Sequence, residues 1–518
     1  MKTNTAENLS PRTEVFAKAR MHARGVEATL GSESMSKKTH TDLEAFCDEQ
    51  GREWARLLFE EHLALRADAE QRVEVTGSDG VERTRARDSQ RTLMTLVGPV
   101  QVPRKAYQAL GSKDLHPMDA TLNLPPERYS LGVRRLVAKE VGRASYDEVV
   151  EMVDDYMGAT VAKRQVEELA VRAAQDFDLF YGLRDLPQST TEDLLVLSTD
   201  AKGIVMRPED LREATKKQAR ASKQKLETRL SGGEKKNRKR MAQVATVYSV
   251  APWVRTPADV IHGLKSKEVE ARRPKVYGKR VWASVEKEQR AVIRAMFDEA
   301  LRQDPDRRRR WVVLVDGDGK QLSTVKAEAR RIGVKPTYIL DLVHVIEYVW
   351  KAARAIFGEA NPEAEPWVAD RLLQLLGGST GGQVAKTIRG FADRNQLEGS
   401  ARKALDGACA YLADRTRTRA MHYLDALQAG LPIATGVIEG ACRYVVKDRM
   451  DRTGARWSLT GAEAVLRLRA VRASGDFDEY WAFHLEQEHA RNHAAHYADG
   501  EVPDPQPRRR PRLRRIKR

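Results

Sequence analysis

The feature that most constrains this chain is a set of short, almost purely apolar runs, two of which end in an aspartate. Residues 194–197 lead toward Asp200, and residues 311–315 lead directly into Asp316. Runs this short and this apolar are typical of strands buried on both faces of a sheet. Strands followed by alternating helices and strands predict an α/β sheet with covered faces. Further strands are expected at residues 242–250, 280–285 and 337–340, and helices at residues 286–303, 325–332 and from 341 onward.

The regions outside the predicted sheet have other patterns. Apolar residues recur at helical spacing over residues 41–72 and 345–435, and more helix is expected over residues 436–496. Extended runs interrupted by turn residues predict a β-hairpin at residues 92–102. Residues 1–40 are polar and poor in aromatic side chains, so this segment is expected to be poorly ordered.

Residues 129–183 are expected to be helical with short breaks. Ser145 and Glu148 have the spacing of a capping box, and Gly158 ends the helix that follows them. A second helix over residues 161–173 completes the outline of a helix-turn-helix. A plain helical hairpin explains the same pattern equally well. The side chains that the second helix would offer to DNA are Lys163, Arg164 and Gln165.

The basic charge of the chain is concentrated in two segments. The 518 residues carry 90 Lys and Arg against 74 Asp and Glu, a formal net charge of +16. Residues 212–240 hold twelve Lys and Arg against three acids, a net of +9, and residues 508–518 hold eight and no acid, a net of +8. Such segments predict contact with the phosphate backbone of a nucleic acid, although solvated charge runs are the simpler alternative.

Composition excludes several classes of protein. The three cysteines form no CxxC pair, which excludes a disulfide framework and a cysteine-based zinc finger and suits a reducing compartment. No apolar run approaches the ~18 residues of a membrane span, and the polar N-terminus does not have the pattern of a signal peptide. The sequence therefore predicts a cytoplasmic protein without a membrane partner.

Three carboxylates are candidates for a metal-dependent site. Asp200 and Asp316 follow apolar strands, at the sheet edge where ligands bind in open α/β sheets. Joined by Glu439 from a helix, they would form an oxygen cage suited to Mg²⁺ and to two-metal phosphoryl transfer. Acids also end strands simply because the chain turns there, and Asp318 competes with Asp316 as the second acid. Glu439 could instead form a helical ion pair with Arg443.

Other polar residues have two interpretations each. His344 follows Asp341 by about one helical turn and is either a positioning residue near the site or a core histidine. Arg456 and Trp457 either contact DNA, or Trp457 seals a helix against the sheet. His489 and His493 lie four residues apart but lack the glutamate of an HExxH zinc site, so metal binding there is not expected.

Several segments, taken together and in order, carry a family resemblance. They resemble the bacterial insertion-sequence transposases of the ISKra type, a DDE group with an RNase H-like catalytic domain, and the resemblance covers about residues 90–490. The segments are residues 197–203 (LSTDAKG), 313–319 (VLVDGDG), 341–344 (DLVH), 436–443 (GVIEGACR), 447–450 (KDRM) and 453–458 (TGARWS).

The resemblance implies a mobile-element enzyme that binds terminal inverted repeats, cleaves DNA and transfers the freed strand. It implies Asp200 on the first strand, Asp316 on the fourth and Glu439 after an all-helical insertion, holding Mg²⁺, for which Mn²⁺ can substitute. The implied partner is double-stranded DNA at the element ends and the target, bound by a homo-oligomer at the bacterial nucleoid. The residues expected to act are Asp200, Asp316 and Glu439 in catalysis and metal binding, Asp341 and His344 in support, and Lys163, Arg164, Gln165, Arg443, Lys447, Arg456 and Trp457 on DNA.

The predicted fold class is an α/β RNase H-like core with a large all-helical insertion, preceded by a mostly helical DNA-binding region. Two alternatives for the function stay open: a catalytically inactive DNA-binding protein derived from a transposase, and a DNA nuclease that does not transfer strands. The expected domains are a disordered segment 1–40, a helix and hairpin 41–110, a helix-turn-helix-like region 111–188, a first core segment 189–344 with a basic insertion 207–241, the helical insertion 345–435, a second core segment 436–498 and a basic tail 499–518.

Overall fold

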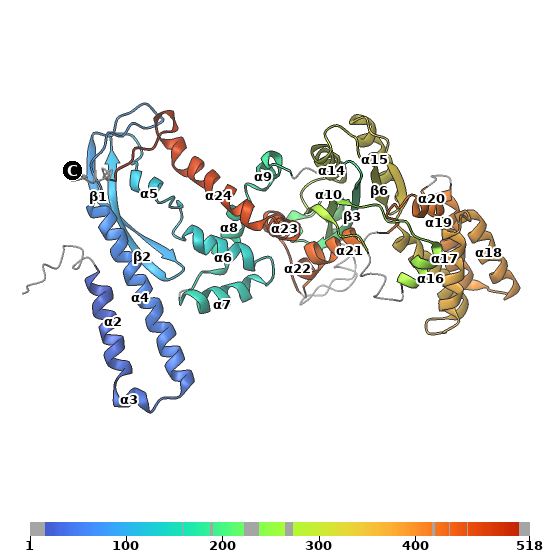
Figure 1. Ribbon diagram of the computed structural model, residues 1–518, viewed down its shortest axis with the longest axis horizontal. Helices are drawn as coiled ribbons and strands as arrows, with labels where there is room; N and C mark the ends of the chain where they lie inside the picture. The colour runs from blue at the N-terminus through green and yellow to red at the C-terminus, as the bar shows by residue number, and fades with distance from the viewer. Residues whose placement is uncertain are drawn as a thin grey trace, which may run out of the picture. The chain divides into compact units, whose positions relative to one another are not determined.

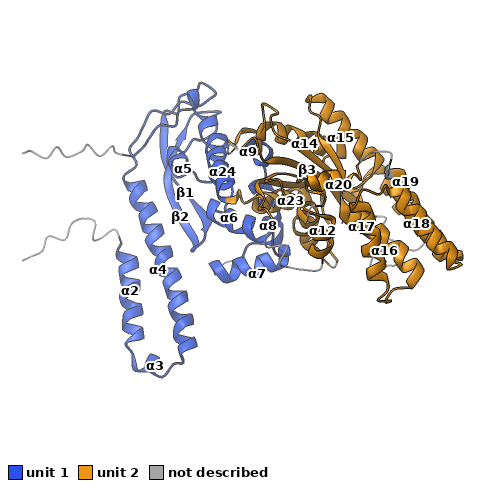
Figure 2. Cartoon of the chain, turned by 45° about the vertical axis from the view of Figure 1, so that its right-hand side comes forward, with its two compact units in different colours: residues 1–180, 478–518 blue, residues 181–477 orange. Residues whose placement is uncertain are grey.

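The chain has a mixed α/β fold and divides into two compact units (Figure 2). Unit 1 combines residues 1–180 with residues 478–518, and unit 2 comprises residues 181–477. The computed structural model describes residues 16–158, 160–186, 190–221, 238–264, 273–416, 420–434, 436–452 and 454–506. Three predicted segments lie partly outside the described residues: the disordered N-terminus at residues 1–15, the centre of the basic insertion at residues 222–237, and the basic tail at residues 507–518.

The described part of unit 1 starts at residue 16 with a helical hairpin, within the segment that the sequence predicts to be disordered. Helix α2 (Ala17–Leu30) and the short α3 (Glu33–Ser36) precede the long α4 (His40–Asp68) (Figure 1). Thr39 starts α4 with a capping box, in which its side chain accepts from the backbone N–H of Asp42 and Asp42 accepts in return. The prediction of poor order is therefore wrong for residues 16–40, because paired helices form there despite a polar composition.

The β-hairpin prediction is confirmed and extended. Strands β1 (Arg85–Thr95) and β2 (Gly98–Gln108) pair antiparallel, with Thr95 opposite Gly98 at the turn. Gly98 has a φ of +102°, a backbone conformation that side chains disfavour. The hairpin residues Leu93, Val100 and Val102 pack on Leu63 of α4, and Met118 from the segment that follows the hairpin completes this cluster.

The remaining helices of unit 1 come from both ends of the chain. The predicted capping box of Ser145 and Glu148 is present, and Gly158 ends that helix in the left-handed conformation. The sequence predicts that residues 436–498 complete the core around the sheet, but residues 478–498 belong to unit 1 instead, because the last long helix bonds to it. These helices are α5 (Pro117–Thr121), α6 (Leu131–Glu140), α7 (Tyr146–Met157), α8 (Lys163–Ala173), α9 (Phe177–Leu183), α24 (Phe477–Asn492), η3 (Ala494–His496) and η4 (Ala498–Gly500). Of these, α9 and α24 include the boundaries between the two units.

Unit 2 is built on a five-stranded mixed sheet, and all five predicted strands are present. Its order is β5-β4-β3-β6-β7; β3, β4 and β5 pair antiparallel, while β6 runs parallel to both β3 and β7. Helix α14 packs on β3 and β4, and α23 packs on β5, which buries the apolar strand residues. The bounds are β3 (Leu194–Val205), β4 (Lys239–Val250), β5 (Tyr277–Ser284), β6 (Trp311–Val315), β7 (Thr337–Leu340), α14 (Gln289–Gln303), α15 (Gly319–Arg331) and α23 (Leu459–Ser474).

The described part of residues 345–434 consists of helices joined by loops and contains no strand, as predicted (Figure 1). A short helix, α21, and the π-helical segment η2 then lead toward α23. None of the helices in the described ranges is long and apolar enough to cross a membrane. The remaining bounds are η1 (Pro208–Asp210), α10 (Glu213–Ala221), α12 (Pro257–Gly263), α16 (Leu342–Phe357), α17 (Ala364–Leu376), α18 (Gly381–Arg394), α19 (Gly399–Thr416), α20 (Tyr423–Gln428), α21 (Gly436–Ala441), η2 (Cys442–Lys447) and α22 (Asp448–Met450).

Candidate functional site

Parallel pairing of β3 with β6 brings Asp200 and Asp316 to the same level of the sheet. The register pairs Ser198 with Leu314, so Asp200 and Asp316 each lie two residues beyond a paired position. Side chains two residues apart on a strand point to the same face. The two carboxylates, 116 positions apart in the sequence, are therefore neighbours. The prediction that Asp200 ends its strand is wrong, because β3 continues to Val205 through its pairing with β4.

Asp316 is held by backbone and side-chain donors on the following helix. The Asp318 N–H donates to Asp316 Oδ1 at 2.8 Å, and Gln321 Nε2 lies 3.4 Å from Oδ2. Burial raises the pKa of the Asp316 carboxyl above its ordinary value, and the charge of Asp200 raises it further. Asp318 has a different role, because its side chain accepts from Gln321 N and caps α15. This difference favours Asp316 over Asp318 as the second acid of the site.

Asp200 is already engaged by groups of its own unit. The Ala201 N–H donates to its Oδ1 at 2.6 Å, and the Cys442 thiol donates to its Oδ2 at 3.1 Å. Lys202 Nζ lies 3.4 Å from the same Oδ2. Burial alone would lower the pKa of the Lys202 ammonium, but the charge of Asp200 raises it above its ordinary value. Lys202 therefore partly compensates the negative charge of the site.

Glu439 lies on α21, close enough to Asp200, Lys202 and His344 that their charges influence its pKa. Burial raises the pKa of the Glu439 carboxyl; a charge on His344 or Lys202 opposes the rise, and Asp200 adds to it. Arg443 pairs with Asp448 at 3.6 Å, so the alternative of a Glu439–Arg443 ion pair has no support. Glu439 thus belongs to the same electrostatic neighbourhood as Asp200.

Asp341 and His344 start the helix that follows β7. Asp341 is buried and caps α16 by accepting from the Val343 N–H at 3.0 Å, so its role is structural. The His344 ring lies close enough to Asp316 and Glu439 that its positive charge would lower the pKa of both carboxyls. His344 therefore lies within electrostatic range of both acids, while its Nδ1 is 4.0 Å from a carboxylate oxygen of Glu347 on its own helix.

Two tyrosines of the helical block support the site and have no signal in the sequence. The Tyr411 hydroxyl donates to the backbone carbonyl of Asp316 at 2.9 Å. Its ring stacks on Tyr348 of α16, with 3.7 Å between ring centroids. The acids are also contacted by Gln321, Lys202 and Cys442. Lys202 follows Asp200 by two positions and Cys442 follows Glu439 by three, and this closeness is the only sequence signal that could have indicated them.

The prediction that Trp457 contacts DNA is wrong. Its side chain is 5% exposed, and its Nε1–H donates to the Met450 carbonyl at 3.1 Å. The Arg449 guanidinium lies 4.6 Å from the ring centroid, and the Trp457 backbone bonds to Val205 and Arg207 at the end of β3. Trp457 seals this region of unit 2, which is the alternative that the sequence left open.

The other predicted DNA-binding residues are accessible. Arg443, Lys447 and Arg456 are exposed on unit 2. In unit 1 the helix, glycine turn and helix of the prediction are present, but the exposed cations at the start of α8 pair with acids. Lys163 Nζ lies 2.7 Å from Asp147, and Arg164 lies 3.0 Å from Glu168, which also accepts from Gln165.

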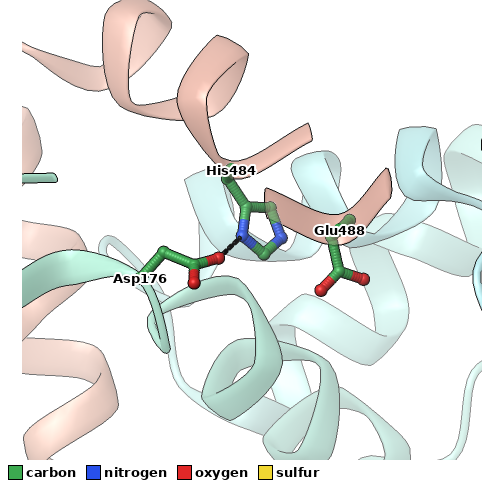
Figure 3. Close-up of side chains that lie close together, drawn as sticks. All are labelled: Asp176, His484 and Glu488. Atoms are coloured by element: carbon green, nitrogen blue, oxygen red, sulfur yellow. Dashed lines mark hydrogen bonds and ion pairs between the residues drawn. The ribbon is translucent and has the colours of Figure 1, made fainter. Parts of the chain in front are cut away.

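A second cluster with metal-ligand chemistry lies in unit 1. Asp176, His484 and Glu488 are buried, and their ligand atoms lie within 4.8 Å of one another, so this triad could hold a metal ion (Figure 3). Within the described ranges it is the only such group, and the three predicted acids of unit 2 form a more open arrangement. The histidine pattern in the sequence did not predict this site.

Arginines already neutralise the unit 1 triad. His484 Nδ1 bonds to Asp176 at 2.7 Å, while Arg134 donates to His484 Nε2 at 3.0 Å and to Glu488 at 2.5 Å. Arg491 contacts both Asp176 and Glu488. Because arginine donates only, His484 Nε2 must accept here, and its lone pair is not available to a metal. A metal ion would have to displace the Arg134 guanidinium.

The sequence matches no protein-family model and no curated protein.

Proposed function

We propose that this chain is the DDE transposase of a bacterial insertion sequence, which binds the inverted repeats of its element and catalyses Mg²⁺-dependent strand cleavage and transfer. The observation that carries the proposal is the parallel pairing of β3 with β6, with Asp200 and Asp316 at the same level. A pair of acids so placed, with a third nearby, is a suitable oxygen-ligand set for a hard divalent cation.

The order of elements supports an RNase H-like core. The family resemblance expects the first acid on the first strand, the second on the fourth strand and the third on a helix beyond an all-helical insertion. Asp200 lies on β3, the first strand of the sheet, and Asp316 follows β6, the fourth. Glu439 lies on α21, after helices α16 to α20.

The donor set of the site fits Mg²⁺. Asp200, Asp316 and Glu439 would hold the metal, which when bound would activate an attacking oxygen and stabilise a leaving oxygen in phosphoryl transfer. Burial raises the pKa of the Asp316 and Glu439 carboxyls, and the charge of Asp200 raises both further. A raised pKa means that nearby positive groups do not fully stabilise the carboxylate charge, and a divalent cation would supply that stabilisation. Tyr411 and Gln321 hold Asp316 in place, and Lys202 and Cys442 hold Asp200.

Exposed cations beyond Glu439 support DNA as the substrate. Arg443 and Lys447 lie on η2, and Arg456 follows it, all within unit 2 and all exposed. Phosphate contacts from such side chains position a nucleic acid without reading its sequence. The predicted reading of the element ends by Lys163, Arg164 and Gln165 belongs to the same proposal.

The proposal is tested with labelled DNA carrying the inverted repeats that flank the gene, incubated with the protein and Mg²⁺. Asp316→Ser and Asp318→Ser form a matched pair, because serine at position 318 can still cap α15. We expect Asp316→Ser, like Asp200→Ala and Glu439→Ala, to abolish cleavage and joining, and Asp318→Ser to retain both.

Each other outcome is informative. Cleavage that survives the substitutions at Asp200, Asp316 and Glu439 would refute the site. Cleavage without a joined product would indicate a nuclease, and specific binding without cleavage would indicate an inactive DNA-binding protein.

A further inference from the structure

The α2–α4 hairpin of unit 1 buries almost none of its own side chains. Within residues 16–62, all of which the structure describes, Ala19 is the only buried residue. Figures 1 and 2 show α2 and the first half of α4 extending together from the body of unit 1, joined by α3 at the tip. Helices in proteins are stabilised mainly by packing of an apolar face, which this pair lacks in a single chain.

Large apolar side chains are exposed along this hairpin. Met21 is 72% exposed, Trp54 45%, Phe59 40% and Leu30 38%. Leu43, Phe46, Leu57 and Leu58 on the same helices are only half-buried. Leu43, Phe46, Trp54, Leu57 and Leu58 recur at helical spacing on one face of α4, and an apolar face that stays this exposed indicates an interface.

The two helices are nevertheless fixed to one another. Glu61 accepts from the backbone N–H groups of Lys18 and Ala19 at 3.0 and 3.1 Å, which caps the start of α2. Further along, His22 Nε2 lies 3.1 Å from the Gln50 carbonyl. The hairpin is therefore a formed surface with a defined register.

The charges of the hairpin indicate what covers it. Helix α2 carries three Lys and Arg against one acid, a net of 3 − 1 = +2, and α4 carries three Arg against eight acids, a net of 3 − 8 = −5. The acidic α4 disfavours DNA at this surface. A partner that offers a basic helix to α4 and an acidic helix to α2 is a second copy of the same hairpin, turned by a two-fold axis.

We propose that the hairpins of two chains pair into an antiparallel four-helix bundle, which makes the protein a dimer without DNA. Each α2 then lies against the α4 of the partner, and the exposed apolar side chains form the centre of the interface. The 29 residues of α4 span roughly 44 Å at about 1.5 Å per residue, long enough for an interface of about 800 Å² per partner. This inference does not depend on the proposed catalytic activity.

The test is analytical ultracentrifugation of the full chain at micromolar concentration without DNA. We expect the wild type to be dimeric and Trp54→Glu to weaken the dimer at least about thirtyfold, because tryptophan at the centre of an interface carries much of its energy. Leu110→Glu is the matched control, since Leu110 is fully exposed in unit 1 but outside the hairpin, and it should remain dimeric. Circular dichroism of both variants checks that the helices are retained.

Charge reversal provides an independent variant. Arg24→Glu makes α2 neutral overall, and we expect it to weaken the dimer by about fivefold or less at low salt, with the difference from wild type vanishing at high salt. A monomeric wild type, or a Trp54→Glu variant that stays as dimeric as Leu110→Glu, would overturn the proposal.

Discussion

Two acidic clusters, one in each unit, differ in how their charge is compensated. In unit 1, the carboxylates of Asp176, Glu488 and Glu127 face the guanidinium groups of Arg134, Arg491 and Arg172, so negative and positive charges are equal in number. In unit 2, Asp200 is paired with Lys202, while burial raises the pKa of the Asp316 and Glu439 carboxyls. The tighter cluster is therefore the poorer candidate for a cation.

This contrast shows that closeness of ligand atoms does not by itself define a metal site. A buried carboxylate needs a positive partner, and an arginine supplies one permanently because it does not lose its proton. In unit 2, the carboxylates of Asp200, Asp316 and Glu439 have one half-exposed lysine, Lys202, beside them. The remaining negative charge could be neutralised by a bound cation. The four predictions that follow probe this difference, beginning with the largest effect.

The first prediction concerns the arginine inside the unit 1 cluster. Arg134 is fully buried, and replacing it by alanine leaves Glu127 and Glu488 without that partner. We expect Arg134→Ala to lower the free energy of unfolding by about 3–5 kcal/mol. The measurement is equilibrium unfolding of the full chain in urea.

The neighbouring residue is the control for this prediction. Arg135 pairs with Asp478 at 2.6 Å; the side chain of Arg135 is half-exposed and that of Asp478 is exposed. Arg135→Ala should cost less than about 1 kcal/mol. Equal losses for the two variants would contradict the view that the cluster is a structural ion-pair network.

The second prediction compares metal binding at the two clusters. We expect Mn²⁺, followed by electron paramagnetic resonance, to bind the wild type and to bind Asp316→Asn at least about tenfold more weakly, because a ligand is lost. Asp176→Asn should bind Mn²⁺ as the wild type does. Loss of binding in Asp176→Asn alone would instead assign the metal to unit 1.

The third prediction concerns the lysine beside Asp200. Lys202 Nζ lies 3.4 Å from Asp200 and offsets its charge where a cation would bind. We expect Lys202→Gln to tighten Mn²⁺ binding by about three- to tenfold, since one competing positive charge is removed. The control is Lys239→Gln, because Lys239 is an exposed residue of β4 that pairs with Val205; this variant should bind Mn²⁺ with unchanged affinity. Weaker Mn²⁺ binding in Lys202→Gln would show that Lys202 does not compete with the metal ion.

The fourth and smallest effect is on the pH dependence of stability without divalent cations. Asp316 and Glu439 have pKa values raised above the ordinary 3.8 and 4.5, so the folded state binds protons more readily than the unfolded state. Their contribution therefore favours folding increasingly as the pH falls from neutrality through the raised pKa values. Between neutral pH and the raised pKa values, the unfolding free energy of the double variant Asp316→Asn, Glu439→Gln should change less than that of the wild type. Identical pH profiles for the two proteins would contradict the raised pKa values of Asp316 and Glu439.

Local sequence patterns predicted most elements of the fold correctly. Apolar runs located all five strands of the sheet, turn residues located the β1–β2 hairpin, and helical spacing located the block that begins with α16. These signals are local, because a strand or helix repeats its buried positions every two or three to four residues. Helices α2, α3, α10 and α12 were not predicted; α2 and α3 lie in a polar segment, where no apolar periodicity signals a helix.

The sequence by itself determined the two aspartates at the ends of apolar runs, the strand and helix order, and the concentration of basic charge in two segments. Only the tertiary structure decided that α24 joins unit 1, that Trp457 is buried, and that Tyr411, Gln321 and Cys442 hold the acids of unit 2. The physical reason is range: a periodic pattern records which face of one element is buried. It does not record which distant side chain, such as Arg134 beside His484 and 350 positions away from it, neutralises a buried charge.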